Sequence, residues 1–525
     1  MRILKNKNIA IFTLVAAIIS GAGCTQKQSE RPNVLFISID DLNDWTGTLK
    51  GHPQAITPNL DELGRQGLLF TNAHCSQAVC TASRNSLLSG LHPTTSGWYG
   101  SISAMRKTYD QVMEDHKMMP HYFKDNGYKT MAVGKVFHQG VTDYKDKMDD
   151  FWDEVAPEYN VPKDLKDRGD GYGGTKFYPF PRDGSQIVNH YGKDFNSGHS
   201  LCWGALERDD MPGGRMFDEL IADWACDRLI EDHDDPFFLA VGFVRPHVPY
   251  TAPKEYFDLY DLDKILIPEV PGDEMADIPL MGKSIAFGTI KTGDHYAVTN
   301  LNDSYWKELV YAYLACVSFV DDQLGKVIEA LENSKYANNT IVVLWSDHGQ
   351  HLGEKKHWRK QALWEESTKV PLYFSFPGQQ TTGQKSSRVV SLLDIYPTLV
   401  DLCGLPADEK LDGQSLVPLL RDPDREWDKP VLNSWYYKNL AVRSENFRYI
   451  HYRDGGEELY DHRNDPGEHL NLAGDPRYAE IIAELSKWLP ETDVLPAGTT
   501  EWTGDKLDRR TEDWTTNDSI PNWLR

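Results

Sequence analysis

The chain has 525 residues and a formal net charge of −24 at pH 7. This length is too great for one compact lobe and predicts two or three domains. The composition, 40% hydrophobic and 26% charged, is ordinary for a globular protein and argues against disorder. The acidic balance argues against a nucleic acid as partner. Seven cysteines in so long a chain do not form a disulfide framework.

The first residues have the features of an export signal. Arg2, Lys5 and Lys7 precede an apolar run of about a dozen residues, which is shorter than the roughly 20 that cross a bilayer as a helix and suits a signal peptide. The following Gly-Ala-Gly-Cys resembles a bacterial lipobox, although Gly21 stands where Leu is preferred. We therefore expect residues 1–23 to be removed and Cys24 to be lipidated. Ordinary signal cleavage nearby is the alternative.

These features predict an exported bacterial lipoprotein, in the outer membrane or the periplasm, that contacts the membrane through its lipid anchor. Loss of the three leader cations changes the formal net charge of the mature chain from −24 to −27. Such a chain opposes loose binding to any polyanion.

From residue 31 to about 375, apolar runs alternate with amphipathic stretches, a pattern typical of an α/β domain with a buried sheet. Four of the apolar runs end in acidic or basic residues; they are residues 33–41, 130–138, 237–247 and 340–349. Ligands of open α/β sheets bind at the carboxyl ends of the strands. The sequence therefore predicts a functional site at this edge.

The last part of the chain has a different pattern. Residues 389–406 predict a strand, a turn and a helix that close the first domain, here assigned to residues 31–420. After the Pro- and charge-rich stretch 421–430, alternating apolar and polar residues around a DGG turn predict antiparallel hairpins. Residues 479–489 predict a helix on that sheet, and the polar tail from 490 a surface strap. Residues 421–525 thus predict a smaller C-terminal α+β subdomain.

Three carboxylates are predicted to meet at the sheet edge: Asp40, Asp41 and Asp347. Carboxylates this close raise one another's pKa unless a cation lies between them. A hard divalent ion meets this need, Ca²⁺ before Mg²⁺ because of its flexible coordination. The alternative is that these residues cap helices, which explains one Asp better than three.

Cys80 begins a predicted buried helix, where backbone amides and the helix dipole favour an anion. Arg84 lies one helical turn further on and faces the same way. A lone Cys is more often a small buried hydrophobe, so its surroundings decide. The basic side chains expected around it are Arg84, Lys135, His138, His247 and Lys360. Together they predict a site for one oxygenated anion.

The stretch Cys80-Thr81-Ala82-Ser83-Arg84 resembles the signature of the type I sulfatases, in which a small residue and then Arg follow the Cys. Further stretches similar to that family are PNVLFISIDDLN, GKVFH, RPHVPY, SDHG, LLDIYPTL and ELYDHRNDPGE. The resemblance covers nearly the whole mature chain. It implies an alkaline-phosphatase-like sulfatase domain with a mixed, mostly parallel sheet between helices.

The resemblance also implies a role for each site residue. Cys80 would be converted to formylglycine (3-oxoalanine) by a sulfatase-maturing enzyme, and Ala82 resembles substrates of the oxygen-independent maturase. One Ca²⁺ would be held by Asp40, Asp41, modified residue 80, Asp347 and His348. The remaining roles are orientation of residue 80 by Arg84, sulfate binding by Lys135 and Lys360, proton donation by His247 and proton acceptance by His138. His351, His357, Trp358 and Arg359 would touch the sugar or lie in a solvated loop.

At two places the sequence departs from the common sulfatase pattern and is similar to the iduronate-2-sulfatase branch. Lys135 and His138 are separated by two residues where arylsulfatases usually have one, and His348 stands where many sulfatases have Asn. That branch also includes bacterial sulfatases of algal polysaccharides. The implied substrates are sulfated oligo- or polysaccharides, such as ulvan or glycans with 2-O-sulfated uronic acids.

Two alternatives belong to other classes. A phosphodiesterase or phosphonate hydrolase of the same superfamily would carry a second metal shell and a Ser or Thr nucleophile. A catalytically dead glycan-binding lipoprotein would have lost Cys80, an acidic ligand or Lys135, all of which are present.

Overall fold

The computed structural model describes residues 31–157, 201–272, 274–287, 294–301, 304–491 and 493–516. Residues 31–525 group into one unit. The expected signal peptide (1–23) and the lipidation site Cys24 lie outside the described residues, so both stay predictions. Within the described ranges, no helix has the length and apolar character needed to cross a membrane.

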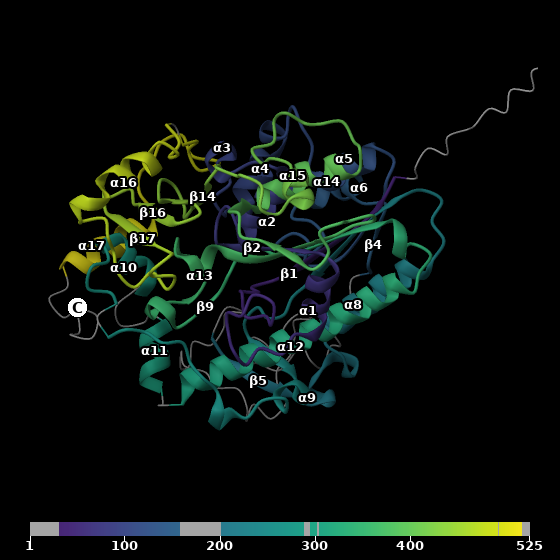
Figure 1. The fold of residues 1–525 in the computed structure, drawn as a ribbon, viewed down its shortest axis with the longest axis horizontal. Coiled ribbons are helices and arrows are strands. Elements are labelled where there is room, and N and C mark those ends of the chain that lie inside the picture. Colours follow the sequence, from purple (N-terminus) through teal and green to yellow (C-terminus); the bar gives the residue numbers. More distant parts are fainter. Residues whose placement is uncertain are drawn as a thin grey trace, which may run out of the picture. The chain divides into compact units, whose positions relative to one another are not determined.

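A mixed, mostly parallel sheet forms the centre of this unit (Figure 1). Its strand order is β12-β2-β11-β8-β1-β6-β3-β4, with β13 also paired to β2. Only β11 runs against its neighbours β2 and β8. The strands are β1 (Asn33–Ile39), β2 (Leu68–His74), β3 (Lys129–Gly134), β4 (Glu154–Val155), β6 (Phe237–Phe243), β8 (Thr340–Ser346), β11 (Lys369–Ser375), β12 (Gln384–Ser386) and β13 (Val390–Ser391).

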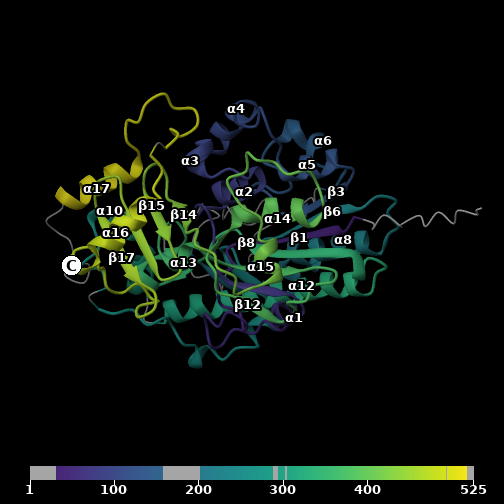
Figure 2. The ribbon, with the colours of Figure 1, turned by 45° about the horizontal axis from the view of Figure 1, so that its top comes forward.

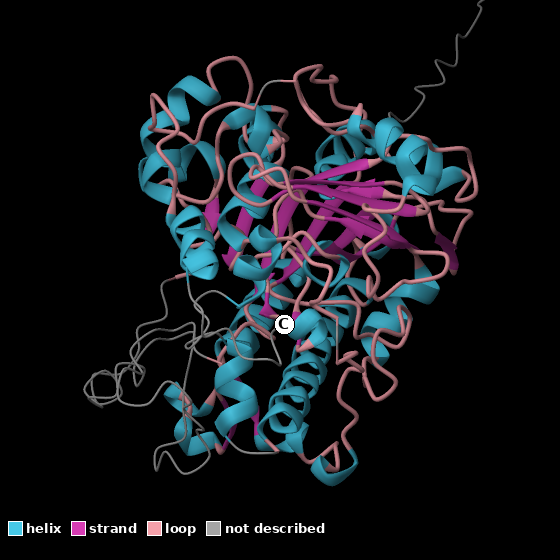
Figure 3. Cartoon of the chain, turned by 90° about the vertical axis from the view of Figure 1, so that its left-hand side faces the viewer, coloured by secondary structure: helices cyan, strands magenta, loops and turns pink. Residues whose placement is uncertain are grey.

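Helices cover both faces of the sheet (Figure 3). Successive side chains of β1 point to opposite faces, so Leu35 and Ile37 belong to one hydrophobic core and Val34 and Phe36 to the other. The first core includes α1 (Pro58–Gln66), α8 (Phe217–Ile230), α9 (Lys254–Phe257) and α12 (Tyr305–Glu332). The second includes α2 (Cys80–Ser89), α4 (Ile102–Val112), α5 (Met119–Asp125), α6 (Met148–Phe151), α14 (Ile395–Leu402) and α15 (Val417–Arg421).

The strand register aligns the four predicted strand ends. Ile39 of β1 pairs with Phe243 of β6 and Ser346 of β8, and Gly134 of β3 pairs with Gly242 of β6. These four strands are parallel neighbours, so the residues that follow them emerge at one edge. The predicted α/β architecture is confirmed, and so is the expectation that these four strands end at one edge of the sheet.

The C-terminal part forms the predicted antiparallel sheet and helix (Figure 2). The sheet runs β14 (Val431–Ser434), β15 (Leu440–Arg443), β16 (Phe447–His451) and β17 (Glu457–Asp461). α16 (Ala479–Ser486) packs Ile481, Ile482 and Leu485 against it. The tail is not only a strap, because it contains α17 (Lys506–Thr516), whose buried Leu507 joins the core around α10 (Leu280–Phe287). The domain limits 31–420 and 421–525 stay predictions.

The remaining α-helices and strands are short. They are α3 (Pro93–Ser96), α11 (Asp294–Leu301), α13 (Glu365–Thr368), β5 (Trp203–Leu206) paired with β7 (Tyr250–Pro253), and β9 (His351–Leu352) paired with β10 (Trp358–Arg359).

A buried ion-pair network joins the C-terminal sheet to α13. Arg448 of β16 contacts Glu365 at 2.5 Å and Glu468 at 2.7 Å, and Arg443 of β15 contacts Glu365 at 2.9 Å. His462 adds a contact of 3.0 Å to Glu468. Glu365, His462 and Glu468 could also group around a metal, but the two arginines already balance the two carboxylates. The network therefore serves to hold α13, which follows Lys360 by a few residues.

Candidate active site

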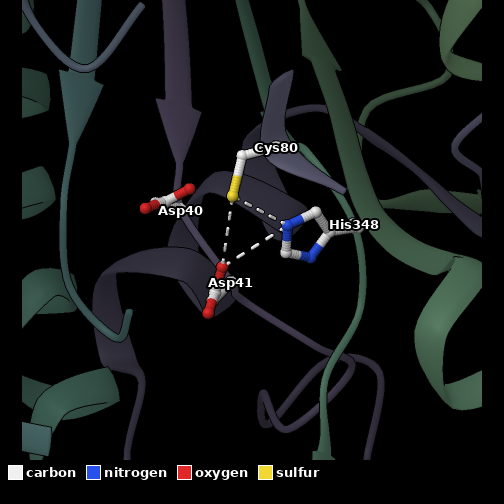
Figure 4. A group of neighbouring side chains, drawn as sticks. All are labelled: Asp40, Asp41, Cys80 and His348. Atoms are coloured by element: carbon white, nitrogen blue, oxygen red, sulfur yellow. Dashed lines mark hydrogen bonds and ion pairs between the residues drawn. The ribbon is translucent and has the colours of Figure 1, made fainter. Parts of the chain in front are cut away.

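Cys80 lies at the centre of the strand-end residues (Figure 4). Its Sγ is 3.2 Å from Nε2 of His348, 3.3 Å from Nζ of Lys360, and 3.9 Å from both Oδ1 of Asp41 and Nζ of Lys135. Burial raises the pKa of the thiol far above its usual range, although the two lysines oppose this. Because the thiolate is the reactive form, unmodified Cys80 is a poor nucleophile at neutral pH.

α2 places Cys80 by being buried along its whole length. Val79 is extended before the helix, and Gly90 ends it with a φ of 73°, a left-handed conformation that glycine adopts easily. Leu87 and Leu88 anchor the helix in the core below the sheet edge. The N-terminal turn therefore points into the site, as the sequence predicted.

Arg84 ties the strand ends together from within α2. Its guanidinium is fully buried and donates to Oδ1 of Asp40 at 3.1 Å and to Oδ2 of Asp347 at 2.9 Å. It also donates to the backbone carbonyls of Lys135 and Val136. Arg84 thus fixes the carboxylates beside Cys80.

The three carboxylates are matched by three basic side chains. Arg84 bridges Asp40 and Asp347, Lys135 pairs with Asp40, and Lys360 pairs with Oδ1 of Asp41 at 2.6 Å. Burial alone would raise the pKa of Asp40, but Lys135 and other cations hold it well below its usual range. Asp41 differs from Asp40, because burial raises its pKa and Asp40 and Asp347 raise it further, while Lys360 lowers it. The predicted repulsion between the carboxylates is therefore seen at Asp41, whereas side-chain cations offset it at Asp40.

The alternative that Asp40 and Asp41 cap a helix is wrong. A turn follows β1, and the next helix, α1, begins only at Pro58. Asp41 takes a φ of 60° in this turn, a conformation that Asp tolerates better than most residues.

The donor set nevertheless fits a divalent cation. Ligand atoms of Asp40, Asp41, Cys80 and His348 lie within 4.8 Å of one another. Oδ2 of Asp41 is buried and has no hydrogen-bond partner in the described part of the chain. His348 donates from Nδ1 to the carbonyl of Gly349 at 2.9 Å, which leaves Nε2 as the ring nitrogen that could bind a metal. Asp347 lies beside this group, its Oδ1 accepting from the backbone amides of Asp41 and His348.

Both predicted catalytic histidines lie near the basic side chains. Burial, Lys360 and Lys135 hold the pKa of His247 well below its usual range, and Nδ1 of His247 donates to the carbonyl of Val248 at 2.5 Å. Burial and then Lys135 lower the pKa of His138 to about 3. Both rings are therefore neutral at pH 7.

The segment before Lys360 is not a solvated loop, because His351, His357 and Trp358 are buried. Nδ1 and Nε2 of His357 lie 2.9 and 2.7 Å from the carbonyl oxygens of Ala286 and Lys360, and either nitrogen can donate to its neighbour, which suits a structural role. Arg359 is 27% exposed and paired with Asp294, so it remains the candidate for contact with a sugar.

One positioning residue escaped the sequence reasoning. Tyr313 of α12 donates to the carbonyl of Asp41 at 2.8 Å and accepts from the amide of Asn43 at 3.0 Å. It is fully buried, so it fixes the turn that presents Asp41. Nothing in the sequence around Tyr313 distinguishes it from other core residues of a long helix.

Comparison with known proteins decides the family. The Sulfatase family model matches residues 32–405. The chain belongs to the sulfatase family. A second model, N-sulphoglucosamine sulphohydrolase, C-terminal, matches residues 353–494. The protein is accordingly a sulfuric ester hydrolase.

Relatives of this sulfatase include proteins with named activities. A sulfatase of Formosa agariphila is 38% identical over an alignment that covers 89% of this chain and 88% of the relative. Iduronate 2-sulfatase of Homo sapiens is 32% identical, covering 90% of this chain and 80% of its own. A solved structure in complex with its substrate D-glucosamine-2-N,6-O-disulfate has a TM-score of 0.65 and 20% identity, covering 94% of this chain and 100% of its own. That last likeness shows the fold alone.

Proposed function

We propose that this sulfatase hydrolyses sulfate esters on oligosaccharides of a sulfated polysaccharide, with Cys80 converted to formylglycine and one Ca²⁺ in the site. The observation that carries the proposal is the position of Cys80 Sγ, within 3.9 Å of two lysine ammonium groups, a carboxylate and an imidazole. Such partners suit an oxygen nucleophile and a bound anion. The thiol of unmodified Cys80, by comparison, is inert. The names of the relatives support sulfated saccharides as the substrate class.

Asp40, Asp41, His348 and residue 80 would hold the Ca²⁺, with Asp347 completing the set. When present, Ca²⁺ and the hydrated aldehyde supply a Lewis acid and a hydroxyl nucleophile. Hard oxygen ligands suit Ca²⁺ better than the soft sulfur of Cys80. Since the site's own acidic and basic side chains balance one another, a divalent ion would leave it positive and ready for an anion.

Lys135 and Lys360 are the groups that would bind the sulfate oxygens. Both ammonium groups are close to Sγ of Cys80 and buried, Lys135 being 5% and Lys360 9% exposed. Fixed charges in a site that excludes water stabilise developing negative charge more strongly than charges in solution. Arg84 holds the carboxylates of Asp40 and Asp347, which follow two neighbouring strands, beside these lysines.

His247 is the candidate proton donor to the leaving sugar oxygen. Its Nδ1 already donates to Val248, so a proton exchanged with substrate would pass through Nε2. An anionic sulfate ester beside Lys135 and Lys360 offsets the positive charge that lowers the pKa of His247, and it thereby favours protonation. His138, also neutral, is the candidate to accept a proton when sulfate is released.

The strong acidic charge of the chain supports exo action. A broad basic surface is what gives affinity for long polyanions, and here the basic side chains gather around a single sulfate. We propose a pocket that takes one sulfated residue at a chain end, after lyases or hydrolases have cut the polymer. An export signal and a lipid anchor at Cys24 would place this enzyme where such fragments are produced.

A panel of defined oligosaccharides from ulvan, carrageenan, fucan and uronic-acid glycosaminoglycans tests the proposal. The enzyme is matured in a host with a sulfatase-maturing enzyme, and Cys80→Ala serves as control. Sulfate release by the wild type alone supports the proposed function. Release by Cys80→Ala, or faster turnover of a phosphodiester or phosphonate than of every sulfated sugar, would overturn it.

A further inference from the structure

An aromatic-lined cavity of about 290 Å³ lies where the catalytic region meets the C-terminal sheet and tail. Its aromatic lining residues are Trp98, Tyr99, Trp435, Tyr436, Tyr437 and Trp502. They come from the segment between α3 and α4, from the β14–β15 turn and from the tail before α17 (Figure 2). Three separate parts of the chain thus combine to build one cavity.

The cavity is next to the sulfate-binding residues on two sides. Gln361, which lines it, follows Lys360, and its amide donates to the carbonyl of Ala78 at 3.0 Å. Gly100, on the opposite lining segment, approaches Val79, since a Cβ built there would lie 3.9 Å from Cγ1 of Val79. Val79 precedes Cys80. The segments that carry Cys80 and Lys360 therefore border the cavity through Val79 and Gln361.

Several features of the lining suit a ligand better than internal packing. Tyr436 is 40% exposed and is held at a φ of 51° in a tight turn, a costly conformation for a bulky residue that tends to occur at functional sites. The hydroxyl of Tyr99 is buried and has no hydrogen-bond partner among the described residues. Buried hydroxyls are normally paired, so the packing around Tyr99 is not optimised for internal hydrogen bonding.

Side-chain contacts hold the wall of the cavity that Trp502 forms. The ring of Trp502 lies between Tyr437, at a centroid distance of 4.9 Å, and the guanidinium of Arg453, 5.0 Å from the ring centre. Arg453 is itself held by Asp505 and Asp508 at 2.7 and 2.6 Å. A wall that is ordered in advance loses little entropy on binding.

We infer that this cavity is a saccharide subsite for the uncharged sugar linked to the sulfated residue, an inference that rests on the proposed function. A pyranose ring presents C–H faces with hydroxyls around the rim, and aromatic walls with a few polar groups match that pattern. The polar lining residues are Ser101, Gln361, Asp505 and Lys506. Arg453 and Lys506 are balanced by Asp505 and Asp508, so the cavity does not favour a second sulfate.

Steady-state kinetics of the full-length matured enzyme tests the subsite. The probes are a sulfated monosaccharide, the matching disaccharide with one unsulfated sugar, and 4-nitrophenyl sulfate. Tyr436→Ala and Trp502→Ala should raise KM for the disaccharide about tenfold and leave the other two probes within about twofold. Tyr436→Phe keeps the ring and should behave as wild type. Trp488→Ala, an exposed aromatic outside the cavity lining, is the matched control.

Two results would overturn the inference. Unchanged KM for the disaccharide in both alanine variants would show that the cavity binds no sugar. Equal losses on all three probes, with thermal unfolding as in wild type, would show that the aromatic residues support the sulfate site instead. Failure of the proposed function is distinguishable, because the wild type would then release no sulfate from either sugar.

Discussion

Replacement of Arg448 by Met should destabilise the protein by about 3–5 kcal/mol, the usual cost of breaking a buried ion pair. Arg448 is fully buried and contacts Glu365 at 2.5 Å and Glu468 at 2.7 Å. It also donates to the carbonyl of Leu363 at 2.9 Å. The change would leave Glu468 without its arginine and beside the His462 ring, while Glu365 keeps Arg443. We therefore expect the lower end of the range, about 3 kcal/mol.

Urea unfolding followed by tryptophan fluorescence measures the loss. Arg463→Met is the matched control, since Arg463 pairs with Asp461 at 2.8 Å but is 55% exposed. An exposed pair of this kind should contribute less than about 1 kcal/mol. Addition of Glu468→Gln to Arg448→Met should recover part of the loss, because it removes the charge that was left unpaired.

Two results would refute this reasoning. One is a loss in Arg448→Met no larger than in Arg463→Met. The other is additivity of the two changes, in which Glu468→Gln destabilises Arg448→Met by as much as it destabilises the wild type. Either would show that the buried network adds no stability beyond that of an exposed pair.

Three further predictions concern the site and the substrate. Peptide mass spectrometry of active enzyme should show formylglycine at position 80, and active enzyme with only unmodified Cys80 would contradict the mechanism. Removal of Ca²⁺ with a chelator should abolish turnover, and Asp41→Asn should weaken Ca²⁺ binding at least about tenfold by neutralising a buried carboxylate, as measured by calorimetry; unchanged affinity would refute the assignment. Size-resolved products should show sulfate released from short oligomers, whereas uniform desulfation of intact polymer would exclude exo action.

The strand-end residues could be predicted from the sequence because the prediction needs only two simple rules. A buried strand is visible as a short apolar run, and parallel strands present their carboxyl ends at one edge. Asp40, Lys135 and Asp347 each follow such a run directly, and His247 follows one after three further residues. Their meeting in space therefore needed no knowledge of long-range contacts.

Other features depend on contacts that no local pattern reveals. Tyr313 reaches the turn after β1 from the middle of α12. β11 pairs antiparallel between β2 and β8, although each of these strands alone looks like the parallel ones. The neutralising role of Lys135 and Lys360 was hidden because charge balance depends on side-chain distances. The aromatic cavity combines segments more than 300 residues apart in the sequence.

The burial of α2 has a consequence for the order of events in the cell. Cys80 is 3% exposed, and each residue of its helix is buried beneath the sheet edge and the loops around it. An enzyme that oxidises this side chain would need access to it, which the folded chain does not give. Oxidation would therefore have to come before folding, and an exported chain would have to meet its maturing enzyme while still unfolded. Enzyme that folds first would keep a thiol that the same treatment can no longer reach.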